Sequence, residues 1–179
     1  MAKAVLQANL VAAKDVSTLN ANFKYASGDI DNGNVFQKGD LSTAAGEEQT
    51  YIPTLPATDQ FTDLWMAFSP EDVILSDAMG NDYKIGINDP RNFTNIAGTI
   101  FSGFKPQVGD IITLTADGIS GDSNDYVIPA NSTAKLAFAA AALDAGLSFK
   151  VLDTTYLSIP SGTWGSQRVT AYKLECVQI

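Results

Sequence analysis

The sequence predicts a mainly β protein, built as a compact sandwich or barrel-like domain with at most one or two short helices. Short apolar runs recur along the chain, and Gly, Pro, Asn and Asp separate them, which favours a sandwich or barrel over alternating βα units. The chain has 179 residues, of which 45% are hydrophobic, enough for one domain with a sizeable core. We therefore expect a single β-rich domain over residues 29–179, preceded by an extended N-terminal arm over residues 1–28.

The arm is predicted from charge. Residues 1–28 contain three lysines and one acid, whereas residues 29–179 contain eight basic and nineteen acidic side chains. This asymmetry suggests that the two regions face different surroundings, and we interpret the segment as an arm that lies on another molecule. The alternative is an amphipathic helix packed on its own domain. The apolar residues near helical spacing are Val5, Ala8, Ala12, Val16, Leu19 and Phe23.

The remaining elements follow in chain order. Asn32-Gly33 is the strongest short hairpin signal, set between Ile30 and the Val35-Phe36 pair. A short helical turn is expected after Asp89, because Pro90 suits a first helical position. The segment 132–145 is ambiguous between a helix and a hairpin that turns at residues 144–146, and we lean to the hairpin. The other candidate strands are 50–52, 64–68, 83–87, 111–115, 126–128, 147–159 and 169–179.

The last two strands show the period of a half-buried sheet. Tyr172, Leu174 and Cys176 alternate with polar residues, so we expect the only cysteine to be a buried core thiol. In the preceding strand the apolar residues alternate as well, and we place them on one face of the sheet. These residues are Leu147, Phe149, Val151, Leu157 and Ile159.

The composition excludes several classes of function. The chain has no histidine and one cysteine, which rules out a Ser-His-Asp triad, a Cys-His pair and a zinc site within one chain. We therefore expect no enzyme and no cofactor. The acidic loops 77–82 and 117–125 have the composition of turns and lack the ligand spacing of a calcium loop, so no metal is expected. The net charge of −9 disfavours nucleic acid, and no apolar run is long enough to cross a membrane.

The segment 100–106 places two aromatic side chains around a flexible Ser-Gly pair. Phe101 and Phe104 could form a partner-facing loop, or they could alternate into the core before the next strand. Both readings are open from the sequence.

A series of turns and strand edges follows in a recognisable order along roughly residues 20–179. The segments are Asp31-Asn-Gly-Asn-Val-Phe-Gln-Lys-Gly-Asp-Leu41, Gly46-Glu-Glu, a Pro-bearing segment through Pro56, Ser69-Pro-Glu71, Asn95-Ile-Ala-Gly98, Val108-Gly-Asp-Ile-Ile-Thr-Leu-Thr115 and the closing Tyr-Lys-Leu-Glu-Cys-Val strand. This order resembles small structural proteins of tailed bacteriophages, namely head decoration or cement proteins. The resemblance implies a β-rich, non-enzymatic virion component, made in the bacterial cytoplasm, that binds the major capsid protein on the capsid exterior and reinforces the lattice. Self-association on the capsid stays open.

With this resemblance, the arm becomes the expected capsid anchor. The expected contact residues are Lys3, Lys14, Leu19, Phe23, Lys24 and Tyr25. An alternative function is a β-sandwich recognition or adhesion module of a phage tail or fibre, in which Trp65, Trp164 or Tyr156 would stack on sugar. Trp65 lies inside an apolar run, so we expect it in the core.

Overall fold

The computed structural model describes residues 2–57, 60–76, 82–86, 89–160 and 165–179. Within these ranges 48% of the chain is strand and 8% is helix, and no helix reaches seven residues. The prediction of a compact, mainly β domain is therefore confirmed. None of the helices in the described ranges has the length and apolarity needed to span a bilayer.

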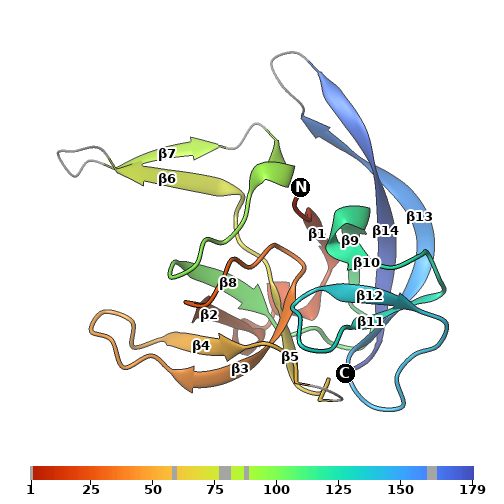
Figure 1. The fold of residues 1–179 in the computed structure, drawn as a ribbon, viewed down its shortest axis with the longest axis horizontal. Helices are drawn as coiled ribbons and strands as arrows, with labels where there is room; N and C mark the ends of the chain where they lie inside the picture. Colours follow the sequence, from red (N-terminus) through yellow and green to blue (C-terminus); the bar gives the residue numbers. More distant parts are fainter. Residues whose placement is uncertain (1, 58–59, 77–81, 87–88, 161–164) are drawn as a thin grey trace.

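One half of the molecule is a seven-stranded sheet (Figure 1). Neighbouring strands are antiparallel except for β10 and β12, which are parallel. The strands, in spatial order, are β1 (Leu6–Leu10), β9 (Ile111–Thr115), β14 (Ser166–Gln178), β13 (Ser148–Pro160), β11 (Tyr126–Pro129), β12 (Leu136–Ala139) and β10 (Ile119–Ser120).

The other half is a closed five-stranded barrel. Its strands, in order around the barrel, are β2 (Asn20–Lys24), β4 (Thr50–Thr54), β3 (Val35–Leu41), β5 (Leu64–Ala67) and β8 (Ile100–Phe104). The β2–β4 pair is parallel and the other pairs are antiparallel. Single 3₁₀ turns occur at Ala12–Lys14, Ser17–Leu19, Pro90–Asn92 and Ala116–Gly118.

Two pairs of strands project from these halves. β6 (Asp72–Ser76) and β7 (Asp82–Gly86) form a two-stranded sheet of their own. In Figure 1 the β6–β7 pair points away from the body on one side. The end of β13 and the start of β14 rise above the body. The long strands are therefore only partly incorporated into the seven-stranded sheet.

The larger core cluster joins the two halves of the molecule. It includes Phe149 and Leu174 from the seven-stranded sheet together with Met66 and Phe104 from the barrel. The barrel interior is aromatic: Phe23 packs edge-on against Phe36 at 4.7 Å and against Trp65 at 5.3 Å between ring centroids. Trp65 is 4% exposed, so its predicted core position is confirmed.

The prediction of a separate N-terminal arm is wrong, and so is the helical alternative. β1 pairs with β9 from Leu6 to Leu10, and β2 pairs with β8 along its whole length. Val5, Leu6 and Phe23 are buried. Residues 6–24 therefore form one edge strand of the sheet and one strand of the barrel, joined by two 3₁₀ turns.

Most of the strands expected from apolar runs are present. The predicted 111–115 strand has the same bounds as β9, and the predicted 50–52, 64–68, 83–87 and 126–128 strands lie on β4, β5, β7 and β11. The turn expected after Asp89 is the 3₁₀ turn Pro90–Asn92, and the Asp89 carboxylate accepts a hydrogen bond from the Arg91 backbone N–H at 3.0 Å.

Two local predictions are corrected by long-range pairing. Asn32-Gly33 does form a turn, with a positive φ of 84° at Gly33, but Ile30 pairs with Asn95 and β3 pairs with β4 and β5. The turn therefore does not join two strands of a hairpin. In the segment 132–145, β12 pairs with β11, so neither the helix nor the hairpin at residues 144–146 forms.

A one-residue bulge corrects the predicted face of the 147–159 strand. Val151 pairs with Leu174 and Asp153 pairs with Lys173, which leaves Leu152 without a paired residue. A bulge shifts the alternation of side chains by one residue. Phe149 consequently belongs to the main core, whereas Leu157 and Ile159 form a separate cluster with Val5 and Ala171.

Candidate partner-binding surface

The three lysines that suggested an arm bind within the molecule. Lys3 pairs with Asp31 at 3.2 Å, and Lys24 pairs with Glu47 at 2.5 Å. The Lys24 ammonium and the Ser42 hydroxyl together lower the pKa of the Glu47 carboxyl. Lys14 donates to the backbone carbonyls of Ala8 and Asn9 at 2.5 and 3.3 Å. Lysine at an edge strand discourages further strand pairing, so Lys14 protects the edge of β1.

The apolar residues predicted as partner contacts face inward. Phe23 is fully buried and cannot reach another molecule. Leu19 and Tyr25 are partly buried against the two cores. Phe101 and Phe104 are 4% and 2% exposed on β8, so the partner-facing reading of that segment is wrong and the core alternative is right. Lys3 and Tyr25 line one shallow pocket, whereas Phe23 contributes to the barrel core.

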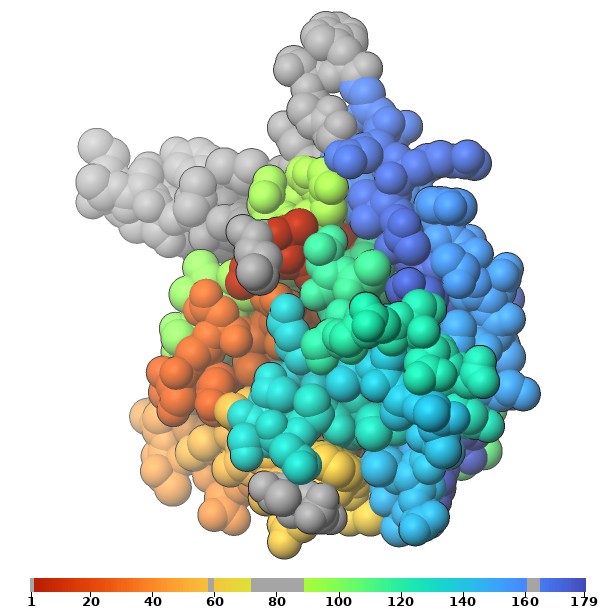
Figure 2. Space-filling model, turned by 45° about the vertical axis from the view of Figure 1, so that its right-hand side comes forward, coloured from red at the N-terminus to blue at the C-terminus, as the bar shows by residue number. Residues whose placement is uncertain are grey.

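The most exposed part of the described sheet is instead formed by the second half of β13 and the first residues of β14. β11 pairs with β13 only at Phe149 and Lys150, and β9 pairs with β14 only from Ala171 to Glu175. Among the described strands, residues 152–160 of β13 therefore have no partner strand other than β14, and residues 166–170 of β14 have none other than β13. We call these residues the β13–β14 ribbon. Figure 2 shows them standing out from the rounded body.

The two faces of the ribbon differ. Leu157 and Ile159, toward the end of β13, pack with Val5 and thereby hold this face of the ribbon against the body. On the opposite face, Tyr156 is 57% exposed and the guanidinium of Arg168 lies over its ring at 5.7 Å. Leu152, at the bulge, is 43% exposed. The ribbon therefore presents an aromatic ring, an arginine and an apolar side chain to its surroundings.

A cleft of about 380 Å³ lies between the body and the end of β13 in the ribbon. Its walls are the start of β1, the segment from Phe68 to Glu71, Pro90 and the ribbon residues from Leu157 to Pro160. Glu71 stands in this cleft, and burial raises the pKa of its carboxyl.

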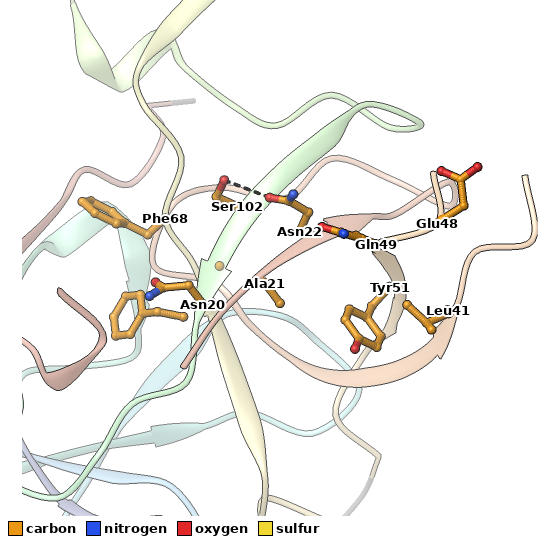
Figure 3. A pocket seen from close by; sticks show the side chains of 11 residues that line it. Asn20, Ala21, Asn22, Leu41, Glu48, Gln49, Tyr51, Phe68 and Ser102 are labelled. Atoms are coloured by element: carbon orange, nitrogen blue, oxygen red, sulfur yellow. Dashed lines mark hydrogen bonds between the residues drawn. The ribbon is translucent and has the colours of Figure 1, made fainter. Parts of the chain in front are cut away.

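A second hollow lies on the outside of the barrel, across β2 (Figure 3). It measures about 610 Å³. Phe68 stands at one end, Tyr51 and Leu41 stand at the other, and Asn20, Ala21 and Asn22 lie between them. We call this hollow the β2 groove.

Sequence reasoning missed both the ribbon and the β2 groove. The sequence did contain a signal for the ribbon, because its apolar patterns predicted two consecutive strands that are longer than any of the others. In the structure β13 and β14 each have 13 residues. Strands in globular proteins are usually five to six residues long, so such strands commonly extend beyond their neighbours. The groove had no local signal, since its lining comes from β2, β3, β4, β8 and the loops beside them.

The other candidate residues give no catalytic or metal constellation within the described ranges. Residues 77–81 of the first acidic loop lie outside the described ranges, and so does Trp164. In the second acidic loop, Asp117 lies within the 3₁₀ turn Ala116–Gly118, and Asp122 and Asp125 are exposed. Across the part of the chain that is described, no three Cys, Asp or Glu side chains are grouped so that they could hold a metal ion.

Cys176 is fully buried, as its position in the last strand predicts. Burial raises the pKa of its thiol to about 12, so it is protonated and unreactive at neutral pH. Comparison of the chain with protein-family models, curated proteins and solved structures gave no match.

Proposed function

We propose that the protein is a structural component of a tailed-bacteriophage virion, which binds the major capsid protein on the outside of the icosahedral capsid and reinforces the lattice. The resemblance of its segment order to decoration proteins supplies the class of partner. The observation that carries the proposal is the β13–β14 ribbon, which packs on the body through Leu157 and Ile159 and pairs with no other described strand.

The chemistry of the ribbon supports a role in protein binding. Tyr and Arg are enriched among the residues that dominate protein interfaces, and here Arg168 lies over the ring of Tyr156. A two-stranded ribbon is only marginally stable in water, and its free edges can accept further strand pairing. Binding to a partner would therefore also stabilise the ribbon.

A capsid lattice also suits a small contact. The ribbon is narrow, only two strands wide, and a specific stable interface usually buries about 800 Å² on each partner. On a lattice the same contact is repeated many times, and each contact that bridges two capsid subunits raises the barrier to their separation. This is the physical sense in which a small β protein reinforces a shell.

The test is co-sedimentation with purified capsids that lack the protein. We compare the wild type with the double variant Tyr156→Ala/Arg168→Ala, and with Ile96→Ala as a control that removes an apolar side chain of similar exposure, 60%, outside the ribbon. The double variant should bind at least about tenfold more weakly, because interface Tyr and Arg residues commonly contribute this much or more. The control should bind like the wild type.

Two results would reject the proposal. Full binding by the double variant would show that the ribbon is not part of the interface with the capsid. Binding of the wild type to tails or fibres, with none to capsids, would favour the recognition-module alternative in place of capsid decoration.

A further inference from the structure

The β2 groove has the dimensions of a ligand site. Its volume of about 610 Å³ is within the usual range of roughly 300 to 1,000 Å³ for ligand pockets. Ala21 and Gly103 are small and form part of its lining. Figure 3 shows Phe68 on one side of β2 and Tyr51 with Leu41 on the other, with polar side chains between them. The groove is therefore an elongated, open site that could hold an extended ligand.

The polar lining consists mainly of neutral hydrogen-bonding groups. Asn20, Asn22 and Ser102 lie across the middle of the groove, and Gln49 borders it on the β4 side. The Asn20 amide is fixed because its Nδ2 donates to the Ala13 carbonyl at 2.6 Å. The Ser102 hydroxyl donates to Asn22 Oδ1 at 3.4 Å. Amide groups offer both donors and acceptors, which suits a ligand rich in hydroxyl groups.

The Phe68 end of the groove is held in place by a buried ring. Phe68 is 39% exposed, and its ring meets the buried ring of Phe104 at 88° with 6.1 Å between centroids. Tyr51, at the other end, has Lys38 Nζ at 3.7 Å from its ring centroid. Phe68 is thus the ring with an exposed apolar surface in the groove, and its orientation is set before any ligand arrives.

Charge and strand pairing exclude other classes of ligand. Among the described residues that line the groove, Glu48 is the only charged one and there is no Lys or Arg, so anionic ligands such as phosphates or nucleic acid are disfavoured. β2 pairs with β8 along its whole length and with β4 at Asn22 and Phe23, which leaves little strand edge for a peptide to extend.

We propose that the β2 groove binds a neutral oligosaccharide. The apolar C–H face of one sugar ring packs on Phe68, and the hydroxyl groups of this and the next ring bind the amides of Asn22 and Gln49 and the hydroxyl of Ser102. This arrangement combines an aromatic ring with planar polar side chains, so it recognises the alternating apolar and hydroxyl-bearing surfaces of a sugar chain.

The experiment is an NMR titration of the isolated, ¹⁵N-labelled protein with four neutral hexasaccharides: maltohexaose, cellohexaose, chitohexaose and α-1,6-mannohexaose. At least one of them should shift the backbone amides of β2 and Ser102 with a Kd below about 10 mM. Phe68→Ala and Asn22→Ala should each weaken this binding at least fivefold. Tyr156→Ala, which removes an exposed aromatic ring on the ribbon, is the matched control and should have no effect.

Asn22→Ala keeps the experiment decisive if Phe68→Ala fails to fold, because Asn22 is exposed and outside both cores. The proposal is overturned if none of the four saccharides shifts groove residues, if the shifts map outside the groove, or if Asn22→Ala binds like the wild type. The titration uses no capsid, so its failure would leave the proposed capsid function standing, and a failure of capsid binding would leave this site standing.

Discussion

Replacing Phe23 with alanine distinguishes the folded N-terminal segment from an arm that binds another molecule. Phe23 is fully buried, and its ring lies within 4.7 to 6.1 Å of the rings of Phe36, Trp65, Phe101 and Tyr51. Phe-to-Ala changes in cores cost about 3 to 5 kcal/mol, and the four aromatic neighbours place this one near the upper end. For a domain of this size the thermal midpoint should fall by roughly 6 to 20 °C.

The assay is thermal and urea unfolding followed by circular dichroism, and the control comes from the same segment. Leu10 is 64% exposed at the end of β1, so Leu10→Ala should change the free energy of unfolding by less than about 0.5 kcal/mol. The reasoning is refuted if Phe23→Ala unfolds within about 2 °C of the wild type. If that variant also lost capsid binding, an exposed anchor would explain Phe23 better than a core residue.

Three further predictions concern other parts of the molecule. Burial raises the pKa of Cys176 to about 12 from an ordinary value of 9.0, so above pH 9 the unfolded state binds fewer protons and stability falls. Urea unfolding should show a loss of about 1 kcal/mol between pH 9 and 10 that Cys176→Ala lacks, and equal pH dependence in both proteins would contradict this. At Gly39 a Cβ would overlap the backbone carbonyl oxygen of Ile52, so Gly39→Ala should lower the free energy of unfolding by about 1 to 3 kcal/mol in the same assay. A change near zero would mean that β3 and β4 can separate at this position. Excess EDTA should leave the thermal midpoint unchanged, and a fall of more than about 5 °C would indicate a structural metal.

The sequence predicted the fold class and most strands because those depend on local patterns. The alternation of Tyr172, Leu174 and Cys176 and the apolar run around Trp65 report burial directly, and all four side chains are buried. The turn at Gly33 was also predictable, because its positive φ suits glycine. These features require only a few neighbouring residues.

Strand pairing was not predictable in the same way. The Asn32-Gly33 signal locates a turn, but it cannot say that Ile30 pairs with Asn95, 65 positions away. The bulge at Leu152 has no sequence mark either, and it moved Leu157 and Ile159 to a second cluster. Both are outcomes of long-range packing, which overrides local pattern.

Charge asymmetry misled the assignment of the N-terminal segment for a related reason. It averages over a whole segment, whereas each lysine there has its own local partner. Lys3 meets Asp31, Lys24 meets Glu47, and Lys14 binds backbone carbonyls of the adjacent strand. A cationic average can therefore arise from three separate structural contacts, with no common partner outside the molecule.

Phe68 connects the two surfaces that we propose as binding sites. It lines the β2 groove, and it also lines the cleft between the body and the end of β13 in the ribbon. If a capsid segment that contacts the ribbon also enters this cleft, it would touch Phe68 and change how a saccharide packs on the same ring. Coupling between two ligands is reciprocal, so capsid binding would then alter saccharide affinity by the same factor by which saccharide alters capsid affinity. Measuring both affinities with and without the other ligand tests this. Equal affinities in all cases would confine the capsid contact to the exposed face of the ribbon around Tyr156.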